Sequence, residues 1–163
     1  MFLWPLALLF ITMRALTINI VLLILIIILV LFWFFRKERN DLKSGETLVK
    51  IGGAEYRVEV ADSPALKAKG LGGKSSLGSD EGMLFPFSPP SKVSFWMKGL
   101  VFPLDIIWIA DGKVIGFEEN VPILSGNDVP TYRPPRPVDY VLEVSAGEVS
   151  KRGIKVGDEV EIR

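Results

Sequence analysis

The chain has 163 residues, 19 basic and 19 acidic residues, and neither histidine nor cysteine. Without imidazole or thiol groups, a serine–histidine triad, a thiol nucleophile and an ordinary zinc site are excluded. The balanced charge also excludes a nucleic-acid binder that works by bulk positive charge, because phosphate contacts need an excess of Lys and Arg.

The apolar residues are concentrated at the amino terminus, where Arg14 is the only charge before residue 36. Residues 15–35 would span roughly 31 Å as a helix at about 1.5 Å per residue, close to the hydrocarbon thickness of a bilayer. Aromatic residues and then cations follow, as at a membrane interface. We predict a single-pass transmembrane helix at 15–35 after an apolar extension at 1–14, with Met13 as a second candidate start.

Two other interpretations of this segment are weaker. A buried core helix does not require an uncharged run as long as residues 15–35. A cleaved signal peptide usually has an apolar stretch of about 7 to 15 residues and a small-residue cleavage site, whereas bulky aromatic residues and cations follow residue 31 here. The charged residues 36–45 are predicted to form a juxtamembrane linker.

The remaining polar domain is predicted at 46–163, and its many Pro and Gly residues exclude long helices. Gly52 and Gly53 predict a tight hairpin between strands at 47–51 and 55–60. Residues 62–70 predict one short helix, because an N-cap candidate, a proline in the first turn and a glycine stop occur in that order.

Six further strands follow from the pattern of short apolar runs. They are predicted at 83–87, 93–98, 104–110, 113–118, 139–144 and 159–163, with a second tight hairpin at residues 111–112. About eight short strands and one short helix favour a mainly β fold, either a compact β-sandwich or a partly closed barrel. Residues 119–137 contain five prolines and are predicted to form an ordered loop over the sheet.

Aromatic residues are densest between 82 and 111, where such density is more typical of a core than of a ligand platform. Lys98 and Asp105 interrupt the apolar runs, and a charge in such a place is solvent-facing, paired or functional. If 93–98 and 104–110 pair through a five-residue loop, these two charges point to opposite faces of the sheet. Lys98 then shares a face with Trp96 and Trp108.

This arrangement has two interpretations. Lys98 and the tryptophans line an aromatic cleft of the kind that binds sugars or extended polymers, or the lysine extends past packed rings into water. The acidic residues show neither an EF-hand spacing nor a paired-carboxylate spacing, and the glycines do not form a phosphate loop. No catalytic residue, cofactor or metal site is therefore predicted.

Six blocks occur in an order that resembles the family called domain of unknown function 192, over residues 46–163. They are KGL (69–71), EGMLFPF (81–87), FWMKG (95–99), PLDIIWI (103–109), VLEVSAG (141–147) and GIKVGD (153–158). The resemblance implies a compact, mainly β domain, often behind a signal peptide or anchor, with no established activity. The motif positions that it carries over are Phe95, Trp96, Met97, Lys98, Pro103, Leu104, Asp105, Glu143, Gly147, Gly157 and Asp158.

The chain departs from the family pattern at two places. Lysines surround Gly70 where the family usually has arginine, so bidentate binding of an anion is not expected there. Residues 99–100 read Gly-Leu in place of the familiar Asn-Thr. The resemblance also suggests that the domain works outside the cytoplasm, whereas the cations at 36–43 place it in the cytoplasm by the positive-inside rule.

These observations favour a membrane-anchored module that binds a ligand or partner, such as an envelope polymer, a sugar or a protein. The candidate binding residues are Trp96, Lys98, Asp105, Trp108, Tyr132 and Glu143. One alternative is a hydrolase of envelope polymers that uses Asp105 and Glu143 as acid and base. Another alternative is a structural or assembly subunit in which the motif serves packing alone.

Overall fold

The computed structural model describes residues 23–28, 30, 46–123 and 130–163. The chain divides into two compact units, Met1–Lys43 and Ser44–Arg163. In the first unit, the described residues are helical. The predicted extension at 1–14, the linker at 36–45 and the remainder of the predicted transmembrane segment at 15–35 lie outside the described residues. None of the helices that are described is long and apolar enough to cross a membrane.

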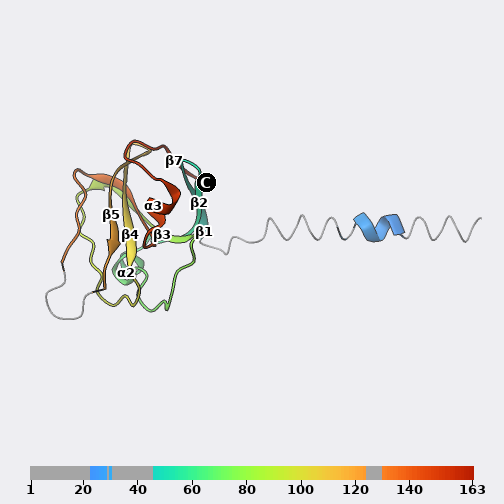
Figure 1. Cartoon of the computed structure of the whole chain (residues 1–163), viewed down its shortest axis with the longest axis horizontal. Coiled ribbons are helices and arrows are strands. Elements are labelled where there is room, and N and C mark those ends of the chain that lie inside the picture. Colours follow the sequence, from blue (N-terminus) through green and yellow to red (C-terminus); the bar gives the residue numbers. More distant parts are fainter. Residues whose placement is uncertain (1–22, 29, 31–45, 124–129) are drawn as a thin grey trace, which may run out of the picture. The chain divides into compact units, whose positions relative to one another are not determined.

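The second unit is built on a seven-stranded sheet (Figure 1). Its strands lie in the order β5-β4-β6-β3-β2-β1-β7, and every neighbouring pair is antiparallel except β2 with β3. The strands are β1 (Glu46–Ile51), β2 (Ala54–Val60), β3 (Glu81–Ser91), β4 (Leu104–Ala110), β5 (Lys113–Val121), β6 (Val138–Ser145) and β7 (Val160–Ile162).

The sheet curls until its two edge strands meet at one end. Lys113 at the start of β5 forms a backbone bridge with Glu159, just before β7. Next to it, the Val114 amide donates to the Asp158 carbonyl at 2.9 Å, and the Gly157 amide donates to the Val114 carbonyl at 2.8 Å. The described strands therefore form one partly closed barrel, and the alternative prediction of a two-sheet sandwich was wrong.

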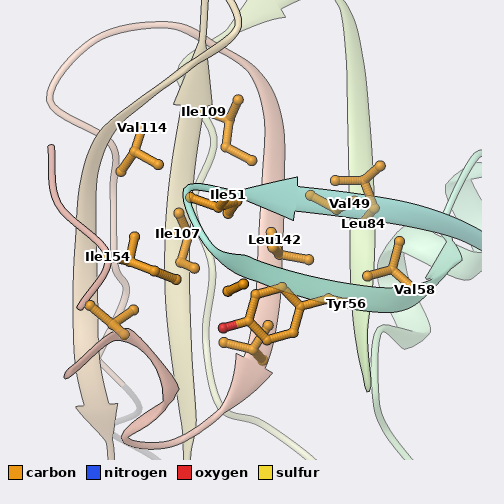
Figure 2. Close-up of a cluster of buried hydrophobic side chains, with 13 residues drawn as sticks. Val49, Ile51, Tyr56, Val58, Leu84, Ile107, Ile109, Val114, Leu142 and Ile154 are labelled. Atoms are coloured by element: carbon orange, nitrogen blue, oxygen red, sulfur yellow. The ribbon is translucent and has the colours of Figure 1, made fainter. Parts of the chain in front are cut away.

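Side chains on the two faces of the sheet pack into two separate apolar cores. The inner core fills the curl, and Figure 2 shows Tyr56 from β2, Ile107 and Ile109 from β4 and Leu142 from β6 pointing into it. The outer core holds the alternate residues of the same strands, because successive strand residues face opposite sides. It includes Met83, Phe85, Ile106, Trp108 and Val141.

A short helix and an irregular segment cover the outer core. The helix α2 (Pro64–Lys69) begins after Ser63, whose hydroxyl accepts a hydrogen bond from the Leu66 amide at 3.2 Å. The segment 93–100 crosses the same face and buries Met97 and Leu100 in the outer core. Both elements therefore lie over β3, β4 and β6, where they border the site described below.

The predicted strand at 93–98 was wrong. Both edges of β4 already pair, with β5 and β6, so no edge is left for this segment. Its alternating apolar residues arise because every second side chain turns toward the outer core. Only Phe95 forms a β-bridge there, with Tyr132, so the predicted count of eight strands falls to seven in the described chain.

The remaining elements agree with the sequence in outline. Both tight hairpins are confirmed, because Ile51 pairs with Ala54 and Ala110 pairs with Lys113. The predicted short helix is α2. A second short helix, α3 (Glu148–Arg152), was not predicted. The predicted loop at 119–137 is described in part: β5 continues to Val121, residues 124–129 lie outside the described residues, and Tyr132 packs against the outer core.

Candidate functional site

A cavity of about 330 Å³ opens between α2, the segment 93–100, and strands β3 and β6. Four aromatic side chains line it: Phe85, Phe87, Phe95 and Trp96. Three lysines, Lys67, Lys69 and Lys98, also line it. Glu143 is the only acidic residue among the described residues of the lining.

The aromatic wall is held in place from behind. Phe95 meets Phe85 edge to face at a centroid distance of 5.0 Å and meets Trp108 at 5.7 Å. The backbone of Phe95 also exchanges two hydrogen bonds with Tyr132, at 2.8 and 2.9 Å. Edge-to-face pairs and backbone bridges restrict the ring, so the wall is formed before any ligand arrives.

Glu143 lies where the sheet is buried on both faces. Its neighbours in β6, Leu142 and Val144, point into the inner core, so Glu143 points to the outer face. In register beside it stand Met83 of β3 and Ile106 of β4. The residue is only 4% exposed, and its Oε2 atom has no hydrogen-bond partner among the residues that the structure describes.

Burial raises the pKa of the Glu143 carboxyl from 4.5 to about 8, because the charged form loses its hydration in apolar surroundings. Within the described chain, Glu143 forms no ion pair that would oppose this effect of burial. Glu143 is therefore mainly protonated at neutral pH. In that form its carboxyl group can both donate and accept a hydrogen bond.

The three lysines of the lining differ in their partners. The Lys67 ammonium group donates to the Pro86 carbonyl and lies 4.5 Å from the centroid of the Phe87 ring. Lys69 and Lys98 are exposed, and in the described part of the chain neither forms an ion pair. These two lysines come from α2 and from the 93–100 segment, so two different elements present cations at the mouth of the cavity.

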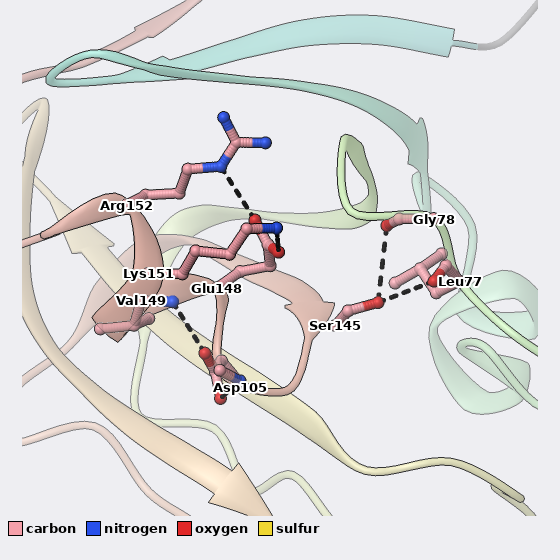
Figure 3. A network of polar contacts seen from close by, with 9 residues as sticks. Leu77, Gly78, Asp105, Ser145, Glu148, Val149, Lys151 and Arg152 are labelled. Carbon is pink, nitrogen blue, oxygen red and sulfur yellow. Dashed lines mark hydrogen bonds and ion pairs between the residues drawn. The ribbon is translucent and has the colours of Figure 1, made fainter.

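Asp105 has a different role from Glu143. It is fully buried on the inner face of β4 and binds three backbone amides. Its Oδ1 accepts from Asn120 at 2.7 Å and from Gly147 at 3.0 Å. Its Oδ2 accepts from Val149 at 2.8 Å (Figure 3). The carboxylate therefore ties β4 to the end of β5 and to the start of α3.

Glu148 shows how the fold treats a third buried acid. Its two carboxylate oxygens accept from Lys151 at 2.9 Å and from Arg152 at 3.0 Å (Figure 3). Burial alone would raise the pKa of Glu148, but these hydrogen bonds and charges lower it below its usual value. Of the three buried acids described, Glu143 alone has a buried oxygen without a partner.

The structure brings together half of the predicted binding residues. Trp96, Lys98 and Glu143 line the cavity, and Trp96 is 49% exposed. Asp105 belongs to the opposite face and does not line the cavity. The prediction that Lys98 and Asp105 point to opposite faces of two paired strands had the wrong basis, because residues 93–98 form no strand. Trp108 and Tyr132 do not line the cavity but support its wall through Phe95.

Sequence reasoning missed several cavity residues. Phe85 and Phe87 fall in a predicted strand, and their spacing of two residues was a signal that they share a face. Lys67 and Lys69 were noted only as departures from an arginine pattern. Their place in a short helix beside an aromatic strand appears only once that helix packs over the sheet.

Comparisons with known proteins place the chain in a family. The model of the family DUF192, described as "Uncharacterized ACR, COG1430", matches residues 47–162. The chain belongs to this family. None of the curated proteins compared matches the chain.

Two solved structures are similar to the DUF192 domain. A crystal structure of a protein of unknown function from Novosphingobium aromaticivorans is 36% identical, with a TM-score of 0.66, over 71% of this chain and 84% of that one. A crystal structure from Sinorhizobium meliloti, described as "a putative transcription regulator", is 32% identical, with a TM-score of 0.64, over 72% of this chain and 93% of that one. The fold is therefore shared with proteins from these two organisms.

The hydrogen bonds of Asp105 predict a large effect of Asp105→Asn on stability. An asparagine replaces one acceptor oxygen by an amino group, so at least one buried backbone amide loses its partner. We expect a loss of about 2–3 kcal/mol in the free energy of unfolding, measured by urea denaturation. Asp139→Asn, which alters a partly exposed acceptor of the Asp111 amide, should cost less than about 1 kcal/mol. Equal effects of the two substitutions would contradict the role given to Asp105.

The raised pKa of Glu143 predicts a dependence of stability on pH. Between pH 4.5 and about 8 the unfolded chain releases the Glu143 proton while the native chain keeps it, so stability falls as pH rises. The slope from this group approaches about 1.4 kcal/mol per pH unit. We expect Glu143→Gln to lose less stability than the wild type between pH 5 and pH 8, measured by urea denaturation.

The matched control for this measurement is Glu55→Gln, because Glu55 is exposed on β2. Its stability should change with pH as that of the wild type does. If Glu143→Gln also follows the wild type across the range, Glu143 does not keep its proton in the folded protein.

Proposed function

We propose that the DUF192 domain of this chain is a ligand-binding module and that its binding site is the cavity above Glu143. The observation that carries the proposal is the buried Oε2 atom of Glu143, which finds no partner in the described part of the chain and belongs to a cavity lined by aromatic rings. A buried polar group without a partner costs about 1–3 kcal/mol. A ligand that binds this oxygen would recover that energy.

The form of the cavity supports the same function. Small-molecule sites range from roughly 300 to 1,000 Å³ and combine apolar walls with a few polar groups. The volume of about 330 Å³ lies at the lower end of this range. A sugar, another small molecule, or a single unit at the end of a polymer or peptide fits such a site.

The alternatives find less support. A hydrolase that uses Asp105 and Glu143 as acid and base needs both groups at one site, but they lie on opposite faces of the sheet. A purely structural role for the motif suits Asp105 and Trp108, which are buried. It does not account for the exposed Trp96 and Lys98 at the mouth of a cavity.

We also propose that residues 15–35 anchor this module to a membrane as a single span. The support is the uncharged run of the sequence, followed by aromatic residues and then by cations. Described residues within this run, such as Leu23 and Ile26, are helical, apolar and exposed.

Filling the cavity should abolish binding. Ala68 lines the cavity from α2 and is exposed, so Ala68→Trp places an indole in the site without disturbing either core. We expect fragments that bind the wild-type full chain, detected by ligand-observed NMR with a library of anionic, neutral and cationic compounds, to lose at least about 90% of their signal change.

The matched control is Ala65→Trp, on the same helix but outside the lining. This variant should bind the same fragments as the wild type, and both variants should keep their thermal unfolding midpoint. Fragments that bind Ala68→Trp as well as Ala65→Trp would place binding elsewhere and overturn the proposal.

The membrane anchor is tested by fractionation. We expect the full chain to sediment with membranes and to resist extraction by alkaline carbonate, because a spanning helix is released only by detergent. A chain that lacks residues 1–35 should appear in the supernatant. Full-length protein in the carbonate supernatant would overturn the anchor and leave the binding proposal unaffected.

A further inference from the structure

We infer that the ligand of this cavity is a small organic anion with a flat apolar body, whose charged group binds Lys69 and Lys98 at the mouth and whose neutral polar end reaches Glu143. This inference rests on the proposed function, because it names the chemical class that the same cavity accepts. Three features of the lining support it: the net positive charge, the aromatic walls and the buried carboxyl group of Glu143.

The lining of the cavity is positively charged. The described lining holds three lysines and one acidic residue, so it carries net positive charge whether or not Glu143 is ionised. Lys67 is already bound to the Pro86 carbonyl and the Phe87 ring, whereas Lys69 and Lys98 are exposed without ion pairs in the described chain. Two cations on separate elements therefore face an incoming ligand and favour a negative group.

The walls of the cavity are aromatic. The rings of Phe85, Phe87, Phe95 and Trp96 form most of its apolar lining. Trp96 is held in the segment beside Phe95, yet half of it remains exposed, which leaves ring surface available for contact. Aromatic side chains bind flat apolar groups through their faces and edges. A planar ring in the ligand would therefore use the walls best.

The inner end of the cavity holds a buried acid. Glu143 is the polar group that the cavity reaches between β3 and β4, and its protonated carboxyl can donate to a ligand oxygen. A hydroxyl or carbonyl group would satisfy it without a second buried charge. A ligand carboxylate would bind better at the mouth, where water and the lysines remain.

A cationic amine is the competing ligand class, since aromatic rings and a carboxylate also bind ammonium groups. It would have to pass three lysines and would require Glu143 to ionise in apolar surroundings. Both requirements weaken its binding. The structure therefore favours an anion over a cation of the same shape.

Three probes with one phenol body separate these classes: 3-(4-hydroxyphenyl)propanoate, 3-(4-hydroxyphenyl)propan-1-ol and tyramine. Each is titrated at pH 7 and low salt into the full chain in lipid nanodiscs by isothermal titration calorimetry, with empty nanodiscs as the blank. We expect the propanoate to bind about five- to tenfold more tightly than the alcohol and tyramine to bind most weakly.

Variants identify the groups responsible. Lys69→Gln and Lys98→Gln should each weaken the propanoate about three- to fivefold and leave the alcohol unchanged, because a partly exposed charge contributes modestly. Lys50→Gln, which removes an exposed lysine of β1 outside the lining, should alter neither probe. Glu143→Gln keeps a neutral donor and should still bind the propanoate.

The dependence on pH gives a separate readout. The charged groups of the described lining are Lys67 and Lys69 from α2, Lys98 from the crossing segment and Glu143 from β6. Above pH 8 Glu143 ionises and places a negative charge beside the bound anion, so propanoate affinity should fall in the wild type and stay constant in Glu143→Gln.

The outcomes distinguish the two proposals. If tyramine or the alcohol binds more tightly than the propanoate, and Ala68→Trp abolishes that binding, the cavity is a ligand site and the anionic class is wrong. If none of the three probes binds the wild type at 10 mM, or if Ala68→Trp binds them unchanged, both the class and the ligand-binding function of the cavity are overturned.

Discussion

Burial of β6 on both faces is the constraint on which the rest of the structure depends. The inner core packs on one side of the strand through Leu142 and Val144, and the outer core packs on the other side around Val141. Glu143 therefore lies in a strand that is covered by apolar side chains on both faces of the sheet. α2 and the 93–100 segment cover the outer face of the sheet but leave a cavity beside Glu143. The site exists because these two elements do not cover Glu143 completely.

The three buried acids of the described chain show how differently one fold can treat a carboxyl group. Asp105 receives three backbone amides and joins elements that are distant in sequence. Glu148 receives two cations from its own helix. Glu143 receives neither, and burial raises its pKa to about 8. Asp105 and Glu148 stabilise the fold through their hydrogen bonds and ion pairs. Glu143 has no such role in the described chain, and a bound ligand would explain its burial.

Local features of the fold were predictable, and distant contacts were not. Gly52 with Gly53, and Asp111 with Gly112, specify their hairpins through backbone conformations that neighbouring residues can reveal. The strand prediction at 93–98 was wrong because alternating apolar residues occur both in a paired strand and in an irregular segment that packs against a core. The sequence marked Asp105 by its place in an apolar run and Glu143 by its place in a family motif. Only the fold distinguishes them, because the amides that satisfy Asp105 lie 15 to 44 residues away in the chain.

The most direct test of this account is the titration of Glu143 itself. Its side-chain carboxyl carbon can be followed by ¹³C NMR in the full chain from pH 3 to pH 10, with Glu143→Gln to assign the resonance. The account predicts a midpoint near pH 8, because burial in apolar surroundings removes the hydration of the charged carboxylate. A midpoint near 4.5 would show that the carboxylate is already solvated or paired, and it would remove the reason for assigning a ligand to this cavity.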